Sequence, residues 1–171
     1  MPKKTAKPKI EDVICDVLTG DEQKNALDFV AFLRANKMSP GWASTNSWAI
    51  SYKKQRICFI RMSGTAHYHD LEGGFWHINH VNYGCINLVS YPDEWEQYIS
   101  DEKLKDMVWN QIRTCKKCYN CKGVKAVVIF GKQFDDVCQN WLFMKNPDVD
   151  ALNCAKKIVL MRKHAIANRC V

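Results

Sequence analysis

The sequence predicts an α+β fold, with an antiparallel sheet of four to five strands covered by N- and C-terminal helices. Apolar residues recur at helical spacing near both ends of the chain, and β-forming residues alternate with period two in its middle. The chain has 171 residues, of which 47% are hydrophobic, and this is ample for one core. We therefore expect a single packed domain.

The N-terminal segment differs in composition from the rest of the chain. Residues 1–9 are basic, contain two prolines and have few apolar side chains that could pack. We expect a disordered basic tail over residues 1–9 and the α+β domain over residues 10–171.

Two helices are predicted after this tail. Residues 10–18 have apolar side chains at helical spacing, and Gly20 ends the pattern. Asp21 can begin a second helix that continues to about Asn36, because Pro40 cannot extend it.

The middle of the chain predicts a meander of four antiparallel strands. Residues 48–52 and 56–62 flank a short polar turn and indicate a hairpin, and strands over 75–80 and 85–89 follow. Such a meander needs helices on one face to be stable.

The second half of the chain alternates between helical and strand patterns. The expected elements are helices over 93–99 and 101–113, a strand over 124–130 that ends at Gly131, a helix over 134–141, and a last helix from 149 to about 164.

Four of the nine cysteines form a motif over residues 114–138. Cys115, Cys118 and Cys121 repeat at intervals of three, and Cys138 follows on the helix expected there. Four thiolates at this spacing can close around one tetrahedral Zn²⁺. The motif therefore predicts a structural zinc knuckle that pins a loop to the scaffold. An iron–sulfur cluster, or redox-active thiols without a metal, are the alternatives.

A second group of metal-ligating or catalytic side chains lies between the predicted second and fourth strands. Its candidate members are His67, His69, Asp70, His77 and His80. His67 and His69 share a face if the segment is extended, but His77 and His80 have opposite parity on a regular strand. An enzyme that uses this segment is thus an alternative, and whether the protein is an enzyme stays open.

Aromatic residues are frequent around the meander. Such side chains usually fill a core, but they also line sites for flat organic ligands, where a few polar groups orient the guest. The candidate ligand-binding residues are Trp48, Tyr52, Arg61, Trp76 and His77.

The formal net charge is +7 at pH 7. The Lys and Arg residues are scattered, apart from the tail and the run Lys116, Lys117, Lys122 and Lys125 in and beside the cysteine motif, where these lysines would offset the negative charge of a metal bound by four thiolates. Nucleic-acid binding through these lysines is a third alternative.

No secretory signal is present and no stretch approaches the roughly 20 apolar residues of a membrane span, so we expect a cytoplasmic protein without a membrane partner. No pattern fixes an oligomeric state.

Several segments carry a resemblance to known proteins. The residues Asn25–Val30, Cys115–Cys121, Ile129–Cys138 and Cys154–Val159 resemble a group of small uncharacterised proteins of anaerobic Firmicutes. This resemblance implies a cytosolic bacterial protein with a cysteine metal knuckle. The order of elements is also similar to small α+β domains of the YdhG type, in which a final helix packs on the sheet.

These patterns together predict a zinc-stabilised, non-catalytic module that binds or senses a flat small molecule. The alternatives are an enzyme that uses the His67–His80 segment and an iron–sulfur redox protein that uses Cys115–Cys138.

Overall fold

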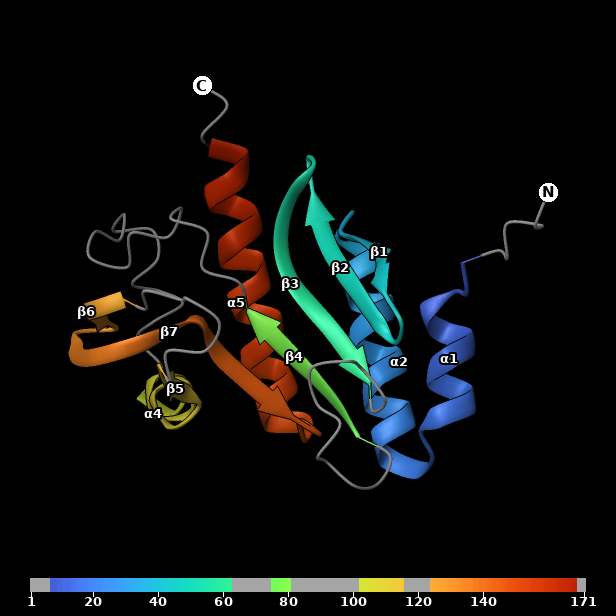
Figure 1. Ribbon diagram of the computed structural model, residues 1–171, viewed down its shortest axis with the longest axis horizontal. Coiled ribbons are helices and arrows are strands. Elements are labelled where there is room, and N and C mark those ends of the chain that lie inside the picture. The colour runs from blue at the N-terminus through green and yellow to red at the C-terminus, as the bar shows by residue number, and fades with distance from the viewer. Residues whose placement is uncertain (1–6, 63–74, 81–101, 116–123, 169–171) are drawn as a thin grey trace.

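The computed structural model describes residues 7–62, 75–80, 102–115 and 124–168, without the side chains of residues 80, 124, 125, 127, 128 and 138–141. This part of the chain has an α+β fold with four helices and a seven-stranded antiparallel sheet (Figure 1). The expected fold class is confirmed. The expected number of four to five strands is too low, because residues 39–44, 112–114 and 132–145, which have little β pattern of their own, also join the sheet.

The described helices agree closely with the expected ones. They are α1 (Ile10–Val17), α2 (Gly20–Ala35), α4 (Glu102–Asn110) and α5 (Val149–Asn168). α4 ends earlier than expected, because residues 112–114 join the sheet instead. The strand expected over 85–89, the helix expected over 93–99 and the first six residues of the expected tail lie outside the described residues. None of the described helices is long and apolar enough to cross a membrane.

The sheet is a meander of four strands extended by a long, bent strand. Its strands are β1 (Ser39–Ser44), β2 (Ser47–Tyr52), β3 (Gln55–Met62), β4 (Trp76–His80), β5 (Ile112–Thr114), β6 (Val124–Ile129) and β7 (Lys132–Lys145). The order is β1-β2-β3-β4-β7-β5, and β6 also pairs with β7. All of the strand pairs are antiparallel.

The helix expected over 134–141 is wrong, because these residues belong to β7. Phe130 and Gly131 both have positive φ, at 49° and 78°, and form the two-residue turn of a β6–β7 hairpin. β7 then hydrogen-bonds to β6, β5 and β4 along its length. This pairing outweighs the helical spacing of a few apolar side chains, so Cys138 lies on a strand.

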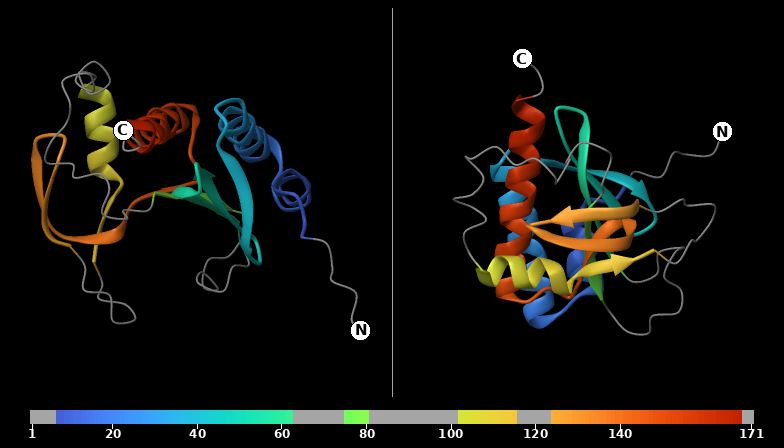
Figure 2. Two further views of the ribbon diagram at one scale, coloured as in Figure 1. Left: turned by 90° about the horizontal axis from the view of Figure 1, so that it is seen from above. Right: turned by 90° about the vertical axis from the view of Figure 1, so that its left-hand side faces the viewer.

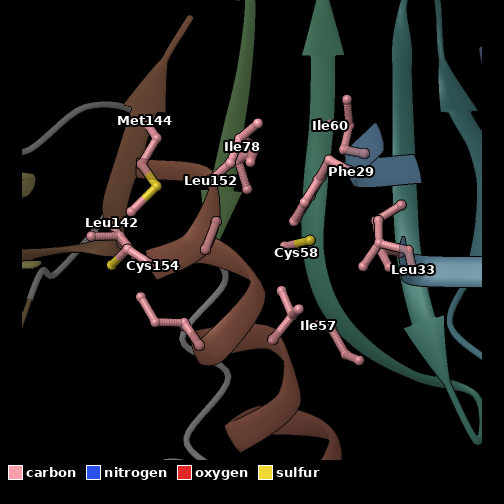
Figure 3. Close-up of a cluster of buried hydrophobic side chains, with 14 of the residues drawn as sticks. Phe29, Leu33, Ile57, Cys58, Ile60, Ile78, Leu142, Met144, Leu152 and Cys154 are labelled. Carbon is pink, nitrogen blue, oxygen red and sulfur yellow. The ribbon is translucent and has the colours of Figure 1, made fainter. Parts of the chain in front are cut away.

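The core lies between one face of the sheet and the helices. Figure 2 shows α2 and α5 side by side over this face, and no described helix on the opposite face. Phe29 and Leu33 of α2 and Leu152 and Cys154 of α5 point toward strand residues such as Ile78 (Figure 3). The cross-strand row Trp48, Ile60, Ile78 and Met144 is entirely buried on this side.

Candidate functional site

The face of the sheet that no described helix covers, which we call the helix-free face, carries two cross-strand rows of side chains. One row joins Ser47, Arg61, His77 and Lys145, and the next joins Ala49, Phe59, Asn79 and Phe143. Successive residues of a strand point to opposite faces, so both rows face away from the apolar row that packs under α2 and α5. Polar, cationic and aromatic side chains are therefore gathered here.

His77 lies at the centre of this face and is fully buried. Its ring stacks on Phe75, with ring centroids 5.9 Å apart, and contacts Phe143, with centroids 4.7 Å apart. Burial, and to a smaller extent the positive charges of Arg61, Arg113 and Lys145, together lower the pKa of His77 to about 3. The imidazole is therefore neutral at physiological pH.

Asn79 follows His77 on the same face and is also fully buried. Phe59 and Phe143 flank it on the neighbouring strands. Neither its amide nitrogen nor its carbonyl oxygen makes a hydrogen bond within the described part of the chain. A buried amide in this state costs free energy of about 1–3 kcal/mol, which marks the position as unusual for a structural residue.

Cationic groups lie over the aromatic rings of this face. The Arg61 guanidinium is 4.7 Å from the centre of the Phe59 ring, and its Nε donates a hydrogen bond to Ser47 Oγ at 3.3 Å. The Arg113 guanidinium is 4.5 Å from the centre of Phe143, and Lys145 Nζ is 5.1 Å from the centre of Phe75. Cation–π contacts hold long side chains in place without neutralising their charge.

The five candidate ligand-binding residues lie on two faces of the sheet. Trp48 and Trp76 are buried on the helix-covered face, where Trp76 contacts Phe29 at a centroid distance of 6.4 Å. Tyr52 is half-buried against the same core. Arg61 and His77 lie together on the helix-free face, so the sheet separates the predicted aromatic residues from the predicted polar ones.

The candidate catalytic segment is described only in part. His67, His69 and Asp70 lie outside the described residues. His77 pairs with Arg61 and Lys145, whereas His80 pairs with Cys58 and Leu142 in the rows that belong to the opposite face. The expected difference in parity between His77 and His80 is confirmed for the backbone.

The cysteine motif is anchored at one point of β7. Thr114 of β5 and Val124 of β6 both pair with Val137, from opposite sides of the strand. Cys115 follows Thr114, and its N–H donates a hydrogen bond to the carbonyl of Asp136. Cys138 follows Val137, so the backbone of the first and fourth cysteines is close.

The other two cysteines of the motif, Cys118 and Cys121, lie outside the described residues. Among the described side chains, no three His, Cys, Asp or Glu residues are grouped so as to hold a metal ion. Cys118, Cys121 and the side chain of Cys138 are not among these described side chains.

Sequence reasoning missed most of the residues that surround Arg61 and His77. These are Phe59, Asn79, Arg113, Phe143 and Lys145. Phe59, Arg61, His77 and Asn79 have the right parity within their own strands, so this part of the face was accessible from alternation alone. Phe143 and Lys145 were not, because they follow residues 134–141, whose apolar spacing predicts a helix.

Comparison of the chain with family models, curated proteins and solved structures finds no match.

Proposed function

We propose that this protein is a zinc-stabilised, non-catalytic module that binds a flat small organic molecule on the helix-free face of its sheet. The observation that carries this proposal is the meeting of three aromatic rings, Phe59, Phe75 and Phe143, with the buried pair His77 and Asn79. Binding sites of this kind combine apolar ring surface with a few fixed polar groups. The helix-covered face has its rings packed in the core and offers no comparable group of polar side chains among the described residues.

The electrostatics of His77 favour binding over catalysis. A general base works best with a pKa near the operating pH, and burial among three cations lowers the pKa of His77 far below it. A neutral imidazole still offers one hydrogen-bond donor and one acceptor. His77 therefore suits ligand recognition, and an enzyme based on it is the alternative.

Zinc is proposed as a scaffold element. Thiolates are soft ligands that suit Zn²⁺, and β5 and β6 hold the two ends of the segment from Cys115 to Cys121 on either side of Val137, next to Cys138. Bound zinc would supply a rigid link between this segment and β7. Four thiolates leave no open coordination position, which is why no chemistry is assigned to the metal.

The test is a ligand screen on the zinc-loaded full chain with selectively ¹⁵N-labelled asparagine. A panel of flat heteroaromatic compounds, both neutral and anionic, is added while the side-chain amide signals are followed. We expect binders to shift the Asn79 amide signal and to lose affinity in Phe143→Ala. Phe32→Ala is the matched control, because Phe32 is a half-buried ring on α2, on the other side of the sheet.

Two outcomes would overturn the proposal. One is that no compound of the panel shifts the Asn79 amide. The other is that binders shift only signals from the helix-covered side and bind Phe143→Ala as well as the unchanged protein.

A further inference from the structure

The helix-free face has a positive charge that no described carboxylate balances. The ion pairs between described residues lie on the helices, for example Arg34 with Glu11 at 2.6 Å and Lys156 with Asp28 at 2.6 Å. Within the described part of the chain, none reaches Arg61, Arg113 or Lys145. Three cations around one buried centre, with no carboxylate paired to them among the described residues, favour an anionic guest.

The buried Asn79 places a second requirement on the ligand, in addition to negative charge. The Asn79 amide presents one donor group and one acceptor atom that meet no partner among the described residues. An amide with both groups available pairs with a ligand edge that carries an adjacent acceptor and donor, as a nucleobase edge does. A simple inorganic anion would use the cations but leave the amide carbonyl unsatisfied.

The phenylalanine rings of the face are the third feature that bears on the choice of ligand. Arg113 lies over Phe143, and Lys145 over Phe75. A flat base can stack on a phenylalanine ring or on the plane of a guanidinium that itself stacks on the ring. Arg61 and Arg113 are partly exposed and Lys145 is exposed, so their charged groups are accessible to an anionic guest at this face.

We propose that the ligand of this face is a free nucleoside phosphate, whose base stacks among Phe75, Phe143 and Arg113, whose base edge pairs with Asn79, and whose phosphate lies between Arg61 and Lys145. This inference rests on the proposed function and names its ligand class. It uses all three features of the face, whereas an uncharged heterocycle would leave the cations without a role.

The experiment is calorimetric titration of the zinc-loaded full chain with adenosine 5′-monophosphate, guanosine 5′-monophosphate, uridine 5′-monophosphate, the matching nucleosides, inorganic phosphate and a single-stranded RNA oligomer. We expect at least one nucleotide to bind about tenfold to a hundredfold more tightly than its nucleoside, since hydrogen bonds to a charged group contribute this much. Inorganic phosphate alone should bind more weakly than that nucleotide.

Variants test the roles of the individual residues. Lys145→Met should reduce nucleotide affinity toward that of the nucleoside, and the matched control Lys24→Met, an exposed lysine of α2, should not. Asn79→Leu should abolish the preference for the base while the thermal midpoint stays the same or rises, because an unsatisfied buried amide is replaced by an apolar group of similar shape. A loss of binding together with a loss of folding in Asn79→Leu would point to a structural amide and count against the proposal.

The outcomes separate this inference from the proposed function. Equal affinity for nucleoside and nucleotide, or unchanged nucleotide affinity in Lys145→Met, overturns the nucleoside phosphate but leaves a flat ligand on this face. Binding of the RNA oligomer without binding of any mononucleotide overturns the nucleoside phosphate as well, and replaces the small molecule by a polymer.

Discussion

The rings of His77 and Phe143 contact each other diagonally across the β4–β7 pair. Their centroids are 4.7 Å apart and the ring planes differ by 36°. In the register, His77 pairs with Lys145 and Phe143 pairs with Asn79. The Phe143 ring therefore packs against the imidazole of His77, which is fully buried.

This contact predicts that the protein loses stability as the pH falls. The pKa of His77 is lowered from its ordinary value of 6.5 to about 3 in the folded protein, so the unfolded state binds more protons between these two values. The free energy of unfolding should fall from this residue by at most about 1.4 kcal/mol per pH unit over that window. Denaturant titrations at a series of pH values measure the slope.

The control for this prediction is His77→Leu, which removes the titrating group and keeps an apolar side chain. Its free energy of unfolding should depend less steeply on pH below about 6.5 than that of the unchanged protein. Equal slopes for the two proteins would contradict the assignment of this pH dependence to His77.

The side chain of Asn146, which follows β7, links β4 to α2 through two hydrogen bonds. Its Oδ1 accepts a hydrogen bond from the Trp76 backbone N–H at 2.9 Å, and its Nδ2 donates one to Glu22 Oε1 at 2.8 Å. Its φ is +41°, in the left-handed region. Asn146→Gly should destabilise the fold by about 1–3 kcal/mol through the lost hydrogen bonds, measured by denaturant unfolding.

A second variant separates the hydrogen bonds of Asn146 from its backbone conformation. Asn146→Ala loses the same hydrogen bonds and adds the strain of a left-handed residue without a compensating side chain, so it should be less stable than Asn146→Gly by about 1 kcal/mol. An alanine variant as stable as the glycine variant would show that the backbone relaxes at this position.

Phe29 packs between α2 and the sheet. It is fully buried, and its ring contacts Trp76. Phe29→Ala should lower the free energy of unfolding by about 3–5 kcal/mol, because a large cavity opens beneath the sheet. Val149→Ala is the control, since Val149 is 64% exposed, and should change it by less than about 0.5 kcal/mol. A loss below about 1 kcal/mol in Phe29→Ala would mean that the core closes around the cavity.

The sequence predicted those elements whose pattern follows from local residues. α2, the β2–β3 hairpin and α5 appeared where apolar spacing placed them, because each buries one regular face against the core. The two residues of the hairpin turn, Lys53 and Lys54, both have positive φ. The turn itself follows from its position between two strands, but lysine is not a residue type that favours positive φ.

Elements that depend on distant pairing were not predictable in the same way. β1 contains Pro40 and Gly41 and becomes a strand through its pairing with β2 at the edge of the sheet. β7 is a strand because β6, β5 and β4 all pair with it, and none of these partners is visible in its own pattern. The candidate site could not be predicted in full for the same reason. Phe143 and Lys145 lie beside His77 only because of the β4–β7 register.

The backbone around the cysteine motif supports a metal site next to β7. Thr114 and Val124 both pair with Val137, so β7 holds the two ends of the segment that contains Cys115, Cys118 and Cys121 at the position of Cys138. Purified without added metal and without oxygen, the protein should contain one zinc per chain, measured by elemental analysis, and no visible absorption band. Iron with sulfide and a broad visible band would replace zinc by an iron–sulfur cluster.

Cysteine variants test whether zinc stabilises the fold. Cys138→Ser should lose the metal and unfold at a clearly lower temperature, because structural zinc contributes on the order of 10 kcal/mol of apparent folding free energy in small peptides. Cys15→Ser is the matched control: Cys15 is an exposed cysteine of α1, and its variant should keep both the metal and the midpoint. A Cys138→Ser protein that retains its zinc and its unfolding temperature would show that the four cysteines do not form one site.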